Sequence, residues 1–174
     1  LATLRYVNRL THHLAYEAGF EGFVRAAKVV LEEECRALLD LISIRQGRGA
    51  QKANDVEVTA EIGCVLAAIE LTRGHAERAL GHLKQPGDVA RKSALNDRNL
   101  AVRILNLRAM AFENLQMSED AYAEYLVSLS LFVGRVDASS PESLITTLLQ
   151  KIKFTPQEWL LLGNLVAGFS RVCS

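Results

Sequence analysis

A chain of 174 residues, 49% apolar and 23% charged, is long enough to fold as one domain around its own hydrophobic core. This composition excludes an intrinsically disordered chain, which would combine few apolar residues with a high net charge. Basic and acidic residues number 20 each, so no net charge draws the chain to nucleic acid or an anionic membrane, although a local basic patch is compatible with this balance.

Apolar residues recur with the period of an α-helix along the whole chain, and no long alternation typical of a strand interrupts them. The three prolines, Pro86, Pro141 and Pro156, stand where helices should begin or end. The pattern predicts an all-α fold of about eight helices, over residues 3–18, 21–44, 55–73, 75–84, 89–115, 118–132, 141–152 and 156–172. Because most connections are short, neighbouring helices should pair as antiparallel hairpins.

Local signals support these boundaries. Residues 45–54 contain two glycines and no apolar stripe, which predicts a loop and the best internal boundary. Residues 85–88 (Gln-Pro-Gly-Asp) predict a turn. Ser118 is suited to enter the helix over 118–132. Thr155 and Glu158 have the spacing of a capping box at the start of the last helix.

Two stretches of the chain resemble each other at an offset of 42 residues. In each, an alanine is followed twelve residues later by a second alanine, and a large apolar residue comes four positions after that. This pattern resembles the tetratricopeptide repeat, in which small residues let two helices pack closely and a bulky residue fills the adjoining space. The residues that would carry this packing are Ala67, Gly74, Ala79, Leu83, Ala109, Phe112, Ala121, Tyr125 and Ser128.

The chain departs from the family pattern in three respects. The offset of 42 residues exceeds the family's usual period of about 34. Glu70 stands where the family prefers a large apolar residue, and Pro86 stands where it prefers alanine.

The resemblance implies a tetratricopeptide-like α-solenoid forming a single domain over residues 1–174. An N-terminal helix pair (1–45) and a C-terminal pair (141–173) would flank two repeat-like hairpins (55–133). The first helices of such a stack line a concave groove, and the matching positions carry Cys64, Ala68, Asn106 and Met110. Of these, Asn106 alone could help to hold a peptide carboxylate, so the resemblance favours a helix or an apolar peptide as ligand.

The last predicted helix is apolar on nearly every side, which is unusual for the end of a repeat stack. We therefore expect it to pack against another chain or against further sequence. The predicted partner-binding residues in the groove and on this helix are Asn106, Met110, Glu113, Trp159, Leu161 and Leu165.

No motif for catalysis, metal or cofactor binding stands out. The four histidines lack zinc-protease or di-iron spacing, and the glycines of residues 47–52 lack the P-loop ending. Cys35, Cys64 and Cys173 form no CxxC pair, which favours three reduced, at least partly buried thiols. Without an evident signal peptide or bilayer-spanning run, the sequence predicts a cytoplasmic protein that is not an enzyme and has no cofactor or metal.

The sequence thus predicts a non-catalytic adaptor or scaffold that binds another protein, or its own copies, within a larger complex. A second reading is a helical nucleic-acid-binding or regulatory module that uses the basic residues between Arg91 and Arg108. A third is an enzyme or cofactor binder with a pocket between helices.

Overall fold

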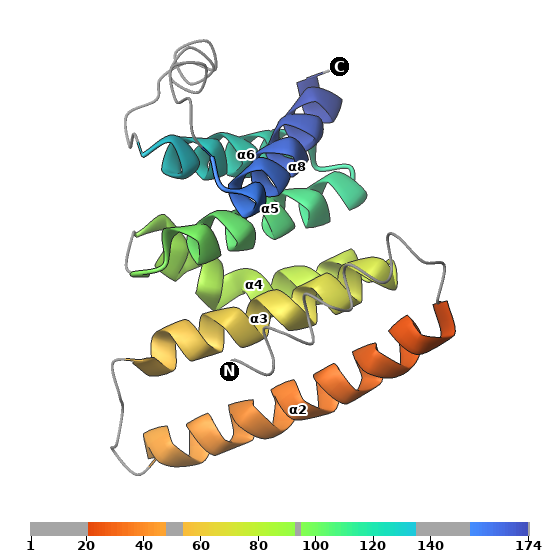
Figure 1. The fold of residues 1–174 in the computed structure, drawn as a ribbon, viewed down its shortest axis with the longest axis vertical. Coiled ribbons are helices and arrows are strands. Elements are labelled where there is room, and N and C mark those ends of the chain that lie inside the picture. The colour runs from red at the N-terminus through yellow and green to blue at the C-terminus, as the bar shows by residue number, and fades with distance from the viewer. Residues whose placement is uncertain (1–20, 48–53, 93–94, 135–153, 174) are drawn as a thin grey trace.

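The computed structural model describes residues 21–47, 54–92, 95–134 and 154–173, and these residues form six helices and no strand. The helices are α2 (Glu21–Gly47), α3 (Asn54–Thr72), α4 (Ala76–Arg91), α5 (Arg98–Asn114), α6 (Ser118–Val133) and α8 (Pro156–Cys173) (Figure 1). The predicted all-α class is confirmed. The two further helices expected over 3–18 and 141–152 lie outside the described residues.

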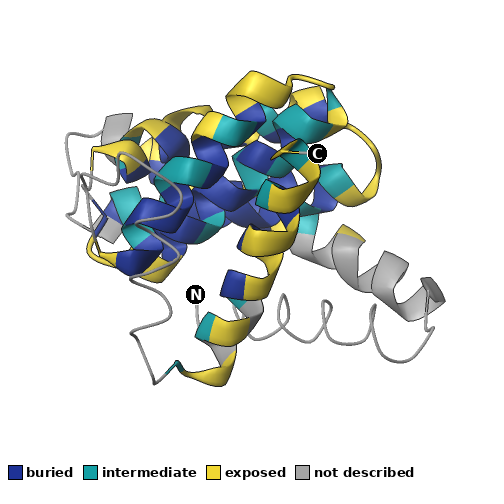
Figure 2. Cartoon of the chain, turned by 90° about the horizontal axis from the view of Figure 1, so that it is seen from above, coloured by how far each residue is buried: buried dark blue, intermediate teal, exposed yellow. Residues whose placement is uncertain are grey.

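The helices follow one another along the long axis of the molecule, with α2 at one end and α8 at the other (Figure 1). Three residues separate α3 from α4, and three separate α5 from α6, so each pair forms an antiparallel hairpin. Helix α2 packs on α3, α5 packs on α4 and also contacts α3, and α8 packs on α6 and also contacts α5. Seen along the long axis, buried residues lie toward the middle of the stacked helices and exposed residues toward the outside (Figure 2).

Alanines lie at the helix contacts, and larger side chains fill the spaces beside them. Seven of the nine predicted packing residues are at most 1% exposed: Ala67, Ala79, Leu83, Ala109, Ala121, Tyr125 and Ser128. Phe112 is half-buried. One core cluster joins α3, α4 and α5, and a second joins α5, α6 and α8. Each large apolar side chain buried in this way stabilises the fold by about 1.5–3 kcal/mol.

The turns of the two hairpins have the same backbone geometry. Gly74 (φ 79°) and Gln116 (φ 60°) both adopt the left-handed conformation, and they are 42 residues apart. In each turn the next amide donates to the carbonyl five positions back at 2.9 Å. His75 and Met117 then occupy N-cap positions with nearly identical dihedral angles. The sequence repeat is therefore accompanied by a structural repeat.

The predicted turn over residues 85–88 is wrong, because α4 continues through it to Arg91. Pro86 has no amide hydrogen to donate to the carbonyl of His82, and it lies buried inside the helix. Gly63 of α3 packs against both residues: a Cβ at Gly63 would lie 2.7 Å from the His82 oxygen and 2.9 Å from Pro86 Cγ. Close packing between the helices outweighs the poor helix propensity of the segment.

The helix predicted over 89–115 is wrong at its start, because α5 begins at Arg98. The Asp97 side chain accepts a hydrogen bond from the Leu100 amide at 3.1 Å and caps the helix. Residues 89–91 belong instead to the end of α4.

Two other helix starts were predicted with different success. The capping box is confirmed: the Thr155 amide donates to Glu158 Oε2 at 2.8 Å, and the Glu158 amide donates to Thr155 Oγ1 at 3.3 Å. Ser118 is the first residue of α6 rather than its cap, and the cap residue, Met117, makes no side-chain cap bond. At the other end of the chain, α2 extends to Gly47, into the predicted loop.

Candidate binding surface

The first helices of the two hairpins lie against each other, whereas α4 and α6 share no contact of similar extent in the described part of the chain. One row of side chains on α3 and its 42-residue counterparts on α5 therefore form a joint surface. We call it the α3–α5 surface and define it by Cys64, Ala68, Arg103, Asn106 and Met110.

Arg103 ties the two helices together. Its Nη2 lies 3.4 Å from Glu61 Oε1 and 3.6 Å from Cys64 Sγ. The Glu61 side chain is almost fully buried, so the guanidinium offsets the cost of burying its carboxylate. Burial raises the pKa of the Cys64 thiol, although the charge of Arg103 opposes this shift. Cys64 is therefore a protonated thiol, which is a poor nucleophile.

Asn106 is the polar group of this surface whose hydrogen-bonding capacity is unfilled. Its side chain is 6% exposed, and its Oδ1 accepts no hydrogen bond from the described residues. A buried amide oxygen without a donor costs about 1–3 kcal/mol. This oxygen is itself buried, so a ligand could donate a hydrogen bond to it and recover that cost only after the Asn106 side chain turns toward the ligand.

The other predicted groove residues differ from one another in their surroundings. Ala68 and Met110 are half-buried, and Met110 packs against the core cluster of α5, α6 and α8. Glu113, one turn beyond Met110, accepts hydrogen bonds from Tyr125 Oη at 2.9 Å and from Arg171 at 2.5 and 3.1 Å. Glu113 thus belongs to the contact that holds α8 on the second hairpin.

That contact has a close approach at its centre. Gly168 of α8 lies over the ring of Tyr125, and a Cβ at Gly168 would overlap the ring. Hydrogen bonds from Arg171 are the largest cause of the lowered pKa of Glu113. Burial, together with the neighbouring Glu113, raises the pKa of the Tyr125 hydroxyl.

The predicted binding residues of α8 are divided between its two sides. Leu165 is 1% exposed and lies in the core with Leu162, and Leu161 is half-buried against the same cluster. Trp159 is 58% exposed, and Val166 is 51% exposed. Leu165 is therefore not accessible to a partner in this structure, whereas Trp159 is.

Most arginines of the basic segment are held in ion pairs. Arg91 and Arg108 both contact Glu124 Oε1, at 2.8 and 2.7 Å, and the Glu124 side chain is 1% exposed. Arg103 pairs with Glu61, as described above. Two further basic residues of the segment, Lys92 and Arg98, are exposed.

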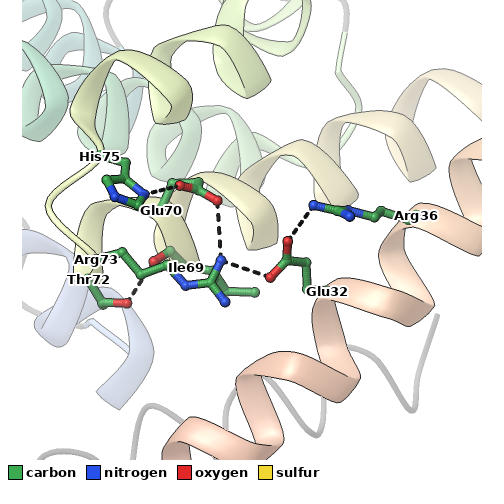
Figure 3. A network of polar contacts seen from close by, with 7 residues as sticks. All are labelled: Glu32, Arg36, Ile69, Glu70, Thr72, Arg73 and His75. Carbon is green, nitrogen blue, oxygen red and sulfur yellow. Dashed lines mark hydrogen bonds and ion pairs between the residues drawn. The ribbon is translucent and has the colours of Figure 1, made fainter.

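A polar network that sequence reasoning missed joins α2 to the first hairpin (Figure 3). Glu32 of α2 contacts Arg36 at 2.6 Å and Arg73 at 2.8 Å. Arg73 also contacts Glu70 at 3.3 Å, and His75 Nδ1 lies 2.8 Å from the other Glu70 oxygen. Arg73 thus links α2 to the first hairpin, and Glu70, the residue that departs from the repeat pattern, contacts both Arg73 and His75.

Burial alone would raise the pKa of Glu70, but the hydrogen bond with His75 and the charge of Arg73 outweigh it and lower the pKa. Glu70 is therefore ionised in the folded protein at neutral pH. The only sequence signal for this network was the misfit of a carboxylate in an apolar position.

The described residues show no sign of a metal site or of a membrane-spanning helix. They contain no group of three His, Cys, Asp or Glu side chains that could hold a metal ion, and none of their helices is long and apolar enough to cross a bilayer. Three cysteines are free; burial raises the pKa of Cys35 to about 11, and Cys173 is exposed. An open depression of about 290 Å³ is lined by Ser118, Glu119, Tyr122 and Val172.

Comparison of the chain with protein-family models, with curated proteins and with solved structures found no significant match.

Proposed function

We propose that this protein is a non-catalytic interaction module, a tetratricopeptide-like α-solenoid of about eight helices that binds a helix or an apolar peptide on its α3–α5 surface. It would act as an adaptor in a larger assembly. The observation that carries the proposal is the unsatisfied Oδ1 of Asn106, set in a row with Ala68 and Met110 between the first helices of two repeated hairpins.

The chemistry of this row suits a peptide. Ala68 offers little bulk, so a partner backbone can approach the helices closely. Met110 is flexible and polarisable, which lets it adapt to a partner's apolar side chains. Once turned toward the partner, the Asn106 amide can accept a hydrogen bond from a peptide N–H or a polar side chain and thereby fix the register of the bound segment.

The repeated turns support the solenoid part of the proposal. Two hairpins with the same turn geometry and the same spacing of contact alanines are what stacking of one structural unit requires. Helix α8 contacts both helices of the preceding hairpin, as α5 contacts α3 and α4. These contacts support a stack that extends beyond the two recognisable copies.

A nucleic-acid-binding function has less support. Arg91, Arg103 and Arg108 are paired with buried carboxylates, and breaking those pairs to reach phosphates would leave Glu61 or Glu124 uncompensated. The two remaining basic side chains of the segment, Lys92 and Arg98, would supply few phosphate contacts. A protein partner is therefore the function that we propose.

The proposal can be tested by placing a photo-crosslinking amino acid at Met110 and, as a control, at Lys84, an exposed residue of α4. In the source cells, crosslinking from position 110 should yield a discrete protein adduct that the Lys84 position does not give. In vitro, the identified segment, made as a peptide, should bind the wild-type chain. Asn106→Leu should weaken this binding by about tenfold, the equivalent of one buried hydrogen bond.

Circular dichroism of each variant would verify that the fold is retained. Equal crosslinking from both positions, or peptide binding that is indifferent to Asn106→Leu and Met110→Glu, would refute the assignment of this surface. Binding that falls steeply with salt and prefers polynucleotides would favour the basic segment instead.

A further inference from the structure

Helix α8 has an uncharged exposed stripe opposite the face that packs on α6. Leu162, Leu165 and Gly168 are buried. The stripe consists of Trp159, Gly163, Val166 and Ser170, all exposed. Positions i, i+4, i+7 and i+11 lie in one line along a helix. A solvated helix face normally carries charged side chains, so an uncharged line of three turns with an exposed tryptophan and valine is typical of an interface.

The tryptophan of this stripe is held in place from behind. Its ring meets that of Phe154 edge-on at 5.0 Å, and Phe154 stacks at 5.6 Å on Phe132, which is 2% exposed. Trp159 therefore loses little conformational freedom when a partner covers it. Large aromatic side chains ordered in this way commonly anchor protein interfaces.

The order of large and small residues in the stripe is self-complementary. We propose that α8 binds α8 of a second copy of this chain, antiparallel, about a two-fold axis that passes between residues 164 and 165. This axis sets Trp159 opposite the partner's Ser170 and Gly163 opposite the partner's Val166. At every level a large side chain meets a small one, so the two helices can approach closely.

Other pairings of the same stripe fit less well. A parallel pair would oppose Trp159 to the partner's Trp159, and it would leave a gap where two copies of Gly163 meet. An antiparallel pair centred on residue 166 would oppose two valines and lose the match between tryptophan and serine. Since the stripe has no charge, no like-charge repulsion opposes the proposed pairing.

This self-association is independent of the proposed ligand surface, because no residue of the α3–α5 surface belongs to the stripe. A single pair of helices gives an interface at the lower end of the usual size range, so we expect a dimer with a Kd of the order of micromolar. The two proposals can thus succeed or fail separately.

Gly163→Val is the test that separates association from folding. No atom lies within 4 Å of the position that a Cβ at Gly163 would take, and valine is no worse a helix former than glycine. The monomer should therefore tolerate the change, whereas the dimer would meet a clash twice, once at each copy of the site. Gly81→Val is the matched control, because Gly81 is an exposed helical glycine of α4 with the same open surroundings.

Sedimentation velocity over about 1–200 µM should show the wild type and Gly81→Val passing from monomer to dimer. Gly163→Val should raise the Kd by about a hundredfold, since overpacking occurs at two symmetric sites. Gly163→Val/Val166→Gly exchanges the large and small partners and should restore most of the association. Trp159 is the single tryptophan, so its emission should shift to shorter wavelength as the dimer forms.

A wild-type chain that stays monomeric over this range would overturn the proposal. So would a dimer that Gly163→Val weakens no more than Gly81→Val does, or a dimer in which the emission of Trp159 does not change.

Discussion

In the α3–α4 hairpin a glycine takes the left-handed position of the turn, whereas in the α5–α6 hairpin a glutamine takes it, and yet the two turns have the same hydrogen bonds. The helix crossings differ more. In the first hairpin Pro86 lies against the backbone of Gly63. In the second, the counterpart of Pro86 is Ser128, whose hydroxyl donates to the Val102 carbonyl at 2.9 Å.

What the hairpins share are the alanines at their contacts. Ala67 and Ala79 in the first copy correspond to Ala109 and Ala121 in the second, and all four are fully buried. Small residues at these points let the two helices of each hairpin pack closely, whatever fills the rest of the contact. The comparison indicates that the repeat is specified by a few small residues and a turn, while its polar and bulky positions are free to differ.

The largest expected difference concerns Glu124, which is buried in the second hairpin, while its counterpart His82 in the first is exposed. Arg108→Met should destabilise the protein by about 3–5 kcal/mol, because it removes the nearer arginine of a buried carboxylate. Replacing both partners, with Arg108→Met/Glu124→Leu, should recover most of this loss. Urea denaturation would measure both.

The matched substitution in the first hairpin, His82→Leu, should change stability by less than about 0.5 kcal/mol. A cost below about 1 kcal/mol for Arg108→Met would mean that Arg91 alone neutralises Glu124.

The next test concerns the close approach of α4 to Gly63, which is specific to the first hairpin, because the second hairpin has Leu105 at the matching position. Gly63→Ala should cost about 1–3 kcal/mol, since the added methyl would press on the His82 carbonyl and on Pro86, both part of one helix. The control is Gly81→Ala on α4, which meets no neighbour and should stabilise the protein by up to about 1 kcal/mol. Thermal unfolding that shifts the same way in both variants would contradict the close crossing.

The two turns can be compared by replacing, in each, the residue whose backbone has the left-handed conformation. Gly74→Ala should cost about 1 kcal/mol, because an alanine with positive φ is strained. Gln116→Gly should stabilise by a smaller amount, about 0.5 kcal/mol, since relief of strain is partly offset by a more flexible unfolded chain. A loss of stability in Gly74→Ala together with a smaller gain in Gln116→Gly, measured by chemical denaturation, would support one shared geometry. A loss of stability in Gln116→Gly would argue against it.

The smallest effect is the pH dependence contributed by Glu70 in the first hairpin and Glu113 in the second. Both have pKa values below the ordinary value of 4.5. Their ionised forms therefore stabilise the fold above about pH 4.5, and this contribution is lost as the pH falls through the lowered pKa. Glu70→Gln and Glu113→Gln should each flatten the acid side of the stability curve, by at most about 1 kcal/mol for such partly exposed pairs.

Acid titrations of the two variants, followed by circular dichroism, would show the difference from the wild type between about pH 2 and pH 5. An unchanged slope of stability against pH would mean that these carboxyl groups have the same pKa in the folded and the unfolded chain.

The sequence was a good guide wherever local chemistry decides the structure. The capping box at Thr155 and Glu158 and the glycine turn at Gly74 could be predicted because each depends on residues a few positions apart. The alanine spacing predicted buried packing positions for a similar reason, since it repeats at a fixed offset.

It was a poor guide where distant contacts outweigh local preference. Nothing near Pro86 signals that Gly63, on another helix, will make a continuous α4 the better solution. The pairing of Glu113 with Arg171 bridges 58 positions, and no local pattern announces it. Glu70 was noticed as an exception, and its partners Arg73 and His75 are close in sequence, but the pairing of Arg73 with Glu32 could be known only once α2 had been placed beside α3.

The uneven coverage of the helices has a consequence for their motions. Helix α5 is enclosed by α3, α4, α6 and α8, whereas α2 meets α3 over one side and exposes Val29, Leu41 and Ile44 on others. Among the described helices, opening of α2 therefore disrupts its packing on α3 and the ion pair of Glu32 with Arg73, while opening of α5 requires that the two core clusters that contain it come apart. Amide protons in α2 should exchange with solvent through local unfolding, and those in the middle of α5 through global unfolding.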